Sequence, residues 1–172
     1  MRITLLCLLT LLTLAPAAAQ RASTPPKQTT DTAQYIGLRY GPTLPRGLKS
    51  TGGSLVSAVE DEKEYAMSEI RRGRIRMLWF DRLTHRDDNG IAYWEVKDVL
   101  VLPAIPNSQI LVYAMCLLND KPDSEIAAIA DHQPTEQYFT RVRKAWRANR
   151  TTEKFEPMPV KGIKCENPAA GL

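Results

Sequence analysis

The stretch MLWFDRLTHRDDNGIAYWEVKDVLVLP, from Met77 to Pro103, decides the expected fold because a turn signal divides two apolar segments. Asn89-Gly90 is a dipeptide that two-residue type I′ hairpin turns prefer. On both sides of it, apolar and polar residues tend to alternate with a period of two, as they do in strands. The stretch therefore predicts an antiparallel hairpin formed by residues 74–83 and 91–102.

Two aspartates fall on the most apolar face of this hairpin. A two-residue turn places Asp81 opposite Asp98, and a four-residue loop keeps both on the same face. A buried carboxylate pair suggests a general acid/base or a hard-cation site, as in a hydrolase or lyase. Alternatively, an arginine neutralises the pair, or a bulge at Val96-Lys97-Asp98 turns Asp98 outward. We favour a structural role, because structural ion networks perturb carboxylates as readily as catalytic sites do.

The predicted fold class is α+β, with an antiparallel β-meander of three to five strands and two helices packed on one face. Residues 109–119 are expected to form the third strand. Because ILVYAMCLL is apolar on both faces, we expect this strand to be central in the sheet or covered on both sides. Residues 125–130 fit either a short strand or a helical turn. Residues 160–165 are a possible edge strand.

Two segments carry helix signals. In residues 54–72, Ser54 suits an N-cap, apolar residues recur at roughly helical spacing, and Gly73 follows the last of them. From Pro134 to about Asn149, proline at the first position is a start signal, and Phe139, Val142 and Trp146 share one helical face. Both segments are therefore predicted to be helices.

The N-terminal residues predict export. Residues 1–19 place Arg2 before an apolar run and end in Ala17-Ala18-Ala19, the pattern of a cleaved signal peptide. We expect a mostly irregular lead-in over residues 20–53, with a possible edge strand or docked segment in AQYIGLRY, and a single domain over residues 54–172. No later segment reaches the roughly 20 apolar residues that a membrane helix needs. The predicted location is therefore periplasmic or secreted, with no transmembrane span in the mature chain.

Cys116 and Cys165 are the only cysteines after the predicted signal peptide. An even count in an exported chain makes them a candidate disulfide, which would close a loop worth roughly 4 kcal/mol in the chain-entropy model. The alternative is that Cys116 is a small buried apolar residue in a strand. Spacing alone leaves both possibilities open.

A run of cations lies within and just after the second predicted helix. Its members are Arg141, Arg143, Lys144, Arg147, Arg150 and Lys154, with Glu153 as the one acid among them. We predict that this stripe binds an anionic envelope component or an acidic protein surface. The alternatives are a solvated helix face or docking against Glu60 to Glu64. The formal net charge of +4 is too small to indicate a nucleic-acid partner.

No motif in the sequence indicates a cofactor or a metal. His85, Asp87 and Asp88 lie at the expected hairpin tip, where polar residues are ordinary, and His132 has no nucleophile at a telling spacing. The leading hypothesis is a small exported, non-enzymatic binding module. The alternative is a hydrolase or lyase that uses Asp81 and Asp98.

Overall fold

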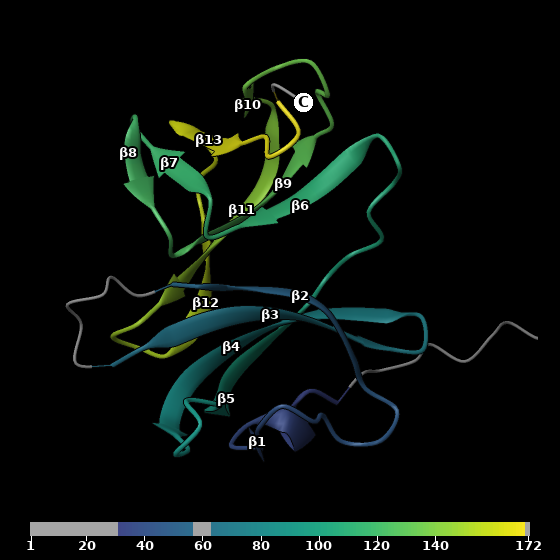
Figure 1. Ribbon diagram of the computed structural model, residues 1–172. Coiled ribbons are helices and arrows are strands. Elements are labelled where there is room, and N and C mark those ends of the chain that lie inside the picture. Colours follow the sequence, from purple (N-terminus) through teal and green to yellow (C-terminus); the bar gives the residue numbers. More distant parts are fainter. Residues whose placement is uncertain (1–30, 57–62, 171–172) are drawn as a thin grey trace, which may run out of the picture.

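The computed structural model describes residues 31–56 and 63–170, and its regular structure is almost entirely β (Figure 1). Sheet A has the order β1-β5-β4-β3-β2, sheet B has the order β12-β11-β9-β6, and sheet C has the order β10-β13-β7-β8. All pairings within the three sheets are antiparallel. The elements are η1 (Ala33–Tyr35), β1 (Arg39–Tyr40), β2 (Lys49–Leu55), β3 (Tyr65–Arg72), β4 (Ile75–Arg86), β5 (Ala92–Val101), β6 (Gln109–Tyr113), β7 (Cys116–Leu118), β8 (Lys121–Asp123), β9 (Ile126–Asp131), β10 (Tyr138–Phe139), β11 (Val142–Asn149), β12 (Lys154–Met158) and β13 (Ile163–Glu166).

Sheet B is the middle layer of the molecule. Five consecutive residues of β9, Ile126 to Ala130, are buried. Ile126, Ala128 and Ala130 belong to the apolar cluster shared with sheet C, whereas Ala127 belongs to the cluster shared with sheet A. Figure 1 shows the same order, with sheet C at the top of the view and sheet A below sheet B. When both faces of a strand are covered, the side chains on both faces must be apolar. This explains why the apolar residues of β9 are consecutive and do not alternate with polar ones.

The prediction of two packed helices is wrong, and with it the α+β fold class. Residues 54–72 hold the end of β2 and all of β3 instead of the first helix. Tyr65 and Met67 pack toward sheet B, while Ile70 packs on the opposite face of sheet A. Because sheet A is covered on both sides, β3 lacks the alternation that marks a half-exposed strand, and the apolar spacing resembled that of a helix.

The second predicted helix, residues 134–149, is replaced by β10 and β11. A register shift between Val142 and Lys144 marks a β-bulge in β11. The bulge places Val142 and Ala145, three residues apart, in the same apolar cluster. Since an extra residue in a strand offsets the period of two, the bulge produces a spacing that also fits a helix.

The third predicted strand, residues 109–119, is divided between two sheets. β6 lies at the edge of sheet B and β7 lies inside sheet C, with Ala114 between them at φ 60°. β6 is therefore not central in its sheet, but the alternative expectation, that both faces are covered, is confirmed, because Val112 packs toward sheet C and Leu111 toward sheet A. Residues 125–130, which were left undecided, are mostly strand β9.

The Cys116–Cys165 disulfide is present, with an S–S distance of 2.06 Å. The two cysteines face each other across β7 and β13, in the interior of sheet C. Residues 160–165 were expected at a sheet edge, but β13 has a neighbour on each side. The disulfide therefore joins two inner strands of the outermost layer.

Residues 31–48, called the strap here, cover the face of sheet A that points away from sheet B. Tyr35, Leu38 and Tyr40 of the strap pack with Trp79 and Met77 of β4. The short strand β1 pairs with β5 at the sheet edge, as the sequence suggested for AQYIGLRY. β2 begins at Lys49, inside the lead-in that was expected to be mostly irregular. The predicted signal peptide lies outside the described residues, and no helix in 31–56 or 63–170 is long and apolar enough to cross a membrane.

Glu153 joins the β11–β12 hairpin to sheet A. Its carboxylate accepts hydrogen bonds from Tyr65 (3.0 Å) and Arg82 (2.8 Å), and the ammonium of Lys97 lies 2.8 Å away. Burial alone would raise the pKa of Glu153, but hydrogen bonds from Lys97 and Tyr65 lower this pKa below its usual value. The ionised carboxylate therefore stabilises the contact between sheets A and B.

We expect Glu153→Gln to lower the free energy of unfolding at pH 7 by about 1–2 kcal/mol, because three charge-assisted contacts are weakened in a partly buried site. A lowered carboxylate pKa adds stability above pH about 4.5, and this increment disappears as the pH falls through the folded-state pKa. Urea unfolding at pH 7 and pH 3 measures the effect. The exposed Glu136→Gln serves as the control, and an equal loss for Glu153→Gln at both pH values would contradict the role of the ionised group.

Candidate functional site

Asp81 and Asp98 do not share a face, so the predicted carboxylate pair does not exist. Asp87 and Ile91 close the β4–β5 turn by backbone hydrogen bonding, which leaves three residues in the loop instead of two, with Gly90 at φ 78°. A one-residue change in loop length reverses the side-chain parity of one strand relative to the other. Together with a register shift between Leu83 and His85, this loop pairs Asp98 with Phe80 and Asp81 with Val96.

Lys97 forms a β-bulge between these two pairs, at the place where the sequence allowed for one. On the sheet B side of β5, a carboxylate oxygen of Asp98 accepts a hydrogen bond from the backbone N–H of Phe155 (2.7 Å). The ammonium of Lys154 lies 3.6 Å from the other oxygen. Asp98 therefore holds β12 against sheet A.

Asp81 lies on the other face of sheet A, beneath the strap. Its side chain is fully buried, and neither carboxylate oxygen has a hydrogen-bond partner with good geometry in the described chain. Burial raises the pKa of Asp81 to about 7, although the nearby hydroxyl groups of Ser68 and Tyr40 act in the opposite direction. At neutral pH the group is thus poised between a carboxylic acid and a buried anion.

The basic stripe predicted on a helix lies instead along the β11–β12 hairpin. Arg141 directly precedes β11, Arg150 follows it in the turn, and Lys154 begins β12. Most of these cations have acidic partners on β8, β9 or β5. Arg143 forms a bidentate pair with Asp131 (2.5 and 2.8 Å), and the hydrogen bond from Arg143 lowers the pKa of Asp131. Arg141 approaches the same carboxylate at 3.6 Å. Lys144 is exposed, and no carboxylate of residues 31–56 or 63–170 lies within ion-pair distance of it.

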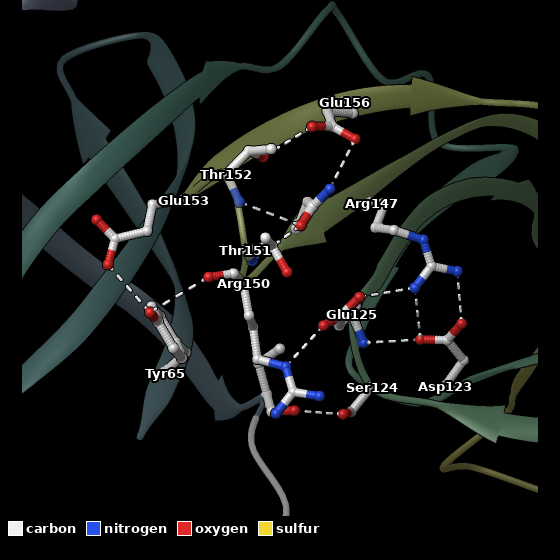
Figure 2. A network of polar contacts seen from close by, with 12 residues as sticks. Tyr65, Asp123, Ser124, Glu125, Arg147, Arg150, Thr151, Thr152, Glu153 and Glu156 are labelled. Carbon is white, nitrogen blue, oxygen red and sulfur yellow. Dashed lines mark hydrogen bonds and ion pairs between the residues drawn. The ribbon is translucent and has the colours of Figure 1, made fainter. Parts of the chain in front are cut away.

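Figure 2 shows the end of the stripe where carboxylates neutralise the arginines most completely. Arg147 contacts both Asp123 and Glu125 at 2.7 Å, and Arg150 contacts Glu125 at 2.6 Å. The hydroxyl of the adjacent Ser124 donates to the backbone carbonyl of Val56. This network connects sheet B to the end of β2, so the cations Arg147 and Arg150 serve the fold.

Three clefts surround the crossover, residues 103–108, which leads from β5 in sheet A to β6 in sheet B. Their volumes are about 570, 390 and 350 Å³. Ile105 lines the first two, and Pro103 and Ala104 line the second and the third, so the clefts are contiguous along this segment. Their charged lining residues are Glu69, Arg74, Arg76, Arg143 and Lys144, with His132 at the wall of the first.

The clefts adjoin a group of arginines that the sequence analysis missed. The basic hairpin, defined as Arg71, Arg72, Arg74 and Arg76, flanks the β3–β4 turn in the run RRGRIR. Glu69 pairs with Arg76 at 2.9 Å and lies 3.8 Å from Arg71. Within residues 31–56 and 63–170, no carboxylate lies within ion-pair distance of Arg72 or Arg74. Gly73, with arginines on both sides, was a signal for the tip of a hairpin. The helix predicted over residues 54–72 instead placed Arg71 and Arg72 at its C-terminal end.

The remaining polar candidates have structural roles. The carboxylate of Asp87 accepts the N–H groups of Asn89 and Ile91 in the turn, and the ring of His85 stacks on Tyr93 at 4.6 Å. His132 is exposed beside the first cleft. In the part of the chain that the structure describes, no group of three His, Cys, Asp or Glu side chains is arranged to hold a metal ion.

Substitutions of Arg147 and Lys144 should distinguish a cation that stabilises the fold from one that is free to bind a ligand. We expect Arg147→Ala to lower the free energy of unfolding by about 2 kcal/mol, because it leaves Asp123 and Glu125 close together without their shared cation. Lys144→Ala should change it by less than about 0.5 kcal/mol. Thermal and urea unfolding of the two variants measure the difference, and similar losses would show that the pairing does not distinguish these residues.

The comparisons with known proteins leave this site to be interpreted from its own residues. The sequence matches no protein-family model, and searches of curated proteins and of solved structures found no significant match.

Proposed function

We propose that this protein is an exported, non-enzymatic binding module that holds an anionic amphiphile of the cell envelope in the clefts around the crossover. The proposal rests on one observation. The clefts contain four cationic side chains and one carboxylate, and two of the cations, Arg74 and Lys144, have no acidic partner in the described chain.

Charge supports an anionic ligand. Arg74 and Arg76 line the second cleft, and Arg143 and Lys144 line the third, which shares Pro103 and Ala104 with the second. Long cationic side chains in partly exposed clefts attract anions over a distance set by the ionic strength, about 8 Å at 0.15 M. An Arg guanidinium also fits phosphate or carboxylate groups through parallel hydrogen bonds.

The apolar walls support an amphiphile over an acidic polysaccharide or an acidic protein. Ile75, Val101 and Ile105 line the second cleft beside the two arginines, and Val101 is 40% exposed. An acyl or alkyl segment gains roughly 25 cal/mol for each Å² of apolar surface that it removes from water. A ligand with an anionic head and an apolar segment therefore uses both parts of the site.

Two features support export. The disulfide is typical of an oxidising compartment such as the periplasm or the cell exterior. The N-terminal residues carry the signal-peptide pattern that the sequence analysis identified. A binding module that meets envelope lipids is consistent with either location.

Sedimentation with vesicles tests the proposal. The protein should bind phosphatidylglycerol vesicles and not phosphatidylcholine vesicles, and affinity should fall on the order of tenfold between 50 and 300 mM salt because exposed charges are screened. Arg74→Glu combined with Lys144→Glu should weaken binding at least about 100-fold, since each reversal changes the charge by two units and each unit near an anionic surface is worth about 1 kcal/mol. Circular dichroism and unfolding should show that the variant keeps its fold.

The matched control is Lys121→Glu combined with Lys161→Glu. These lysines are exposed, belong to β8 and to the turn before β13, and give the same change in net charge away from the clefts. The control should bind within about threefold of the wild type, since an effect of net charge alone would reduce both variants equally. Equal loss in the two variants would contradict a site at the crossover. Equal affinity for a soluble acidic polysaccharide or polyglutamate would contradict the choice of an amphiphile.

A further inference from the structure

The strongest unexplained feature of the molecule is a buried polar group without partners beneath the strap. Asp81 and the indole N–H of Trp79 are both buried, and neither makes a hydrogen bond within the described residues. Trp79 and Asp81 are two residues apart on β4, so their side chains point to the same face of sheet A. Tyr35 and Tyr40 of the strap pack against the Trp79 ring, at centroid distances of 5.3 and 5.7 Å.

The strap itself is held by few directional contacts. The backbone N–H of Gly37 donates to Val96, the N–H of Val96 donates to Leu38, and the strand pairing of β1 involves only two residues. The Arg39 side chain is 76% exposed and pairs with Glu95 at 3.1 Å on the surface. Local opening of such a segment needs less free energy than global unfolding, because it breaks only the contacts of the strap and leaves the pairing of the other strands intact.

One further contact links the strap to the basic hairpin, which adjoins the clefts although Arg72 itself lines none of the three. Arg72 of the basic hairpin donates hydrogen bonds to the Tyr35 hydroxyl (2.9 Å) and to the Gln34 side-chain oxygen (3.3 Å). Both acceptors belong to η1 in the strap. While the strap is closed, the Arg72 guanidinium is directed to these neutral acceptors and is partly withheld from an anionic ligand.

We propose that the strap is a pH-operated cover: ionisation of Asp81 beneath it opens the strap and releases Arg72 to the anionic ligand. The opening rests on the structure of the strap alone, whereas the effect on ligand binding also rests on the proposed function.

The groups that face Asp81 determine the direction of the effect. The strap contributes the Tyr40 hydroxyl, β3 contributes Ser68, and β5 contributes Val96 as the cross-strand neighbour. No Lys, Arg or His of residues 31–56 or 63–170 acts on the carboxyl. Burial of the Tyr40 hydroxyl and the nearby charge of Asp81 both raise the pKa of Tyr40, so this hydroxyl remains protonated. No cation compensates the anion once it forms.

The raised pKa of Asp81 determines whether the strap opens as the pH rises or as it falls. The closed strap favours the protonated acid, with a pKa of about 7 against 3.8 when the group is free in solution. Closure is therefore most stable below pH about 4 and loses stability as the pH rises to about 7, after which both states are ionised and the effect is constant. Within this window the opening equilibrium should increase about tenfold for each pH unit, and by as much as about 1,000-fold in total.

Amide hydrogen exchange between pH 5 and pH 8 tests the cover without any ligand. Protection factors for residues 37–40, corrected for the intrinsic exchange rate, should fall about tenfold per pH unit up to pH 7 and then level off. Those of β9 should not follow the same curve. Asp81→Asn, which cannot ionise, should show a strap protection that does not change with pH.

Flat protection of residues 37–40 in the wild type would overturn the proposal, as would an equal fall in β9, which would indicate general destabilisation. If Asp81→Asn does not fold, the comparison of the strap with β9 in the wild-type protein still decides the matter. Fluorescence adds a second measurement, because Trp79 is fully buried beneath the strap and should shift to longer wavelength over the same pH range.

The effect on binding is tested with phosphatidylglycerol vesicles at constant salt. Affinity should rise about fivefold from pH 5 to pH 8 in the wild type, the contribution of one added cation. The rise should be absent in Asp81→Asn and in Arg72→Gln. An unchanged rise in Arg72→Gln would overturn the role of Arg72. Failure to bind vesicles at any pH, with a strap that still opens, would count against the proposed function and not against the cover.

Discussion

The architecture depends on the close packing of small side chains along β9. Ala127, Ala128 and Ala130 are fully buried, and they face sheets A and C in turn. Short side chains on both faces let two other sheets approach the same strand, so a chain of this size forms three layers around one inner sheet. The crossover between sheets A and B and the clefts beside it lie where two of these layers meet.

Much of the strand content was predictable from the sequence, whereas its arrangement was not. The β4–β5 hairpin was found from Asn89-Gly90 and from the alternation around it, because turn preference and period act locally. The predicted loop was one residue too short, and this error placed Asp98 on the wrong face of the sheet. Successive side chains of a strand point to opposite faces, so a shift of one residue exchanges the two faces. The helices were predicted wrongly for a related reason. Burial of both faces in β3 and a bulge in β11 each remove the simple period of two.

The candidate site illustrates the same limit. The cations of β11 were visible in the sequence, but their partners Asp123, Glu125 and Asp131 lie on other strands, and only the folded pairing shows which cations are compensated. The basic hairpin was present in the sequence as RRGRIR, yet its meaning depended on the β3–β4 turn that the helix prediction excluded. Asp81 was singled out for its apolar surroundings, and its burial agrees with that observation. Its cover came from a lead-in expected to be mostly irregular.

The disulfide also determines how the chain would respond to mechanical tension. Cys116 and Cys165 enclose a covalent ring that contains β8 to β12, whereas all of sheet A and β6 lie outside it. A force applied between residue 31 and residue 170 passes through the sulfur–sulfur bond and does not load residues 117–164. Sheet A would then be extended first, beginning with the strap, while the ring keeps the strands of β9, β11 and β12 together. In such a pull the part of the chain before the ring, which carries the strap, would be the extensible one, whereas the strands inside the ring would carry no load.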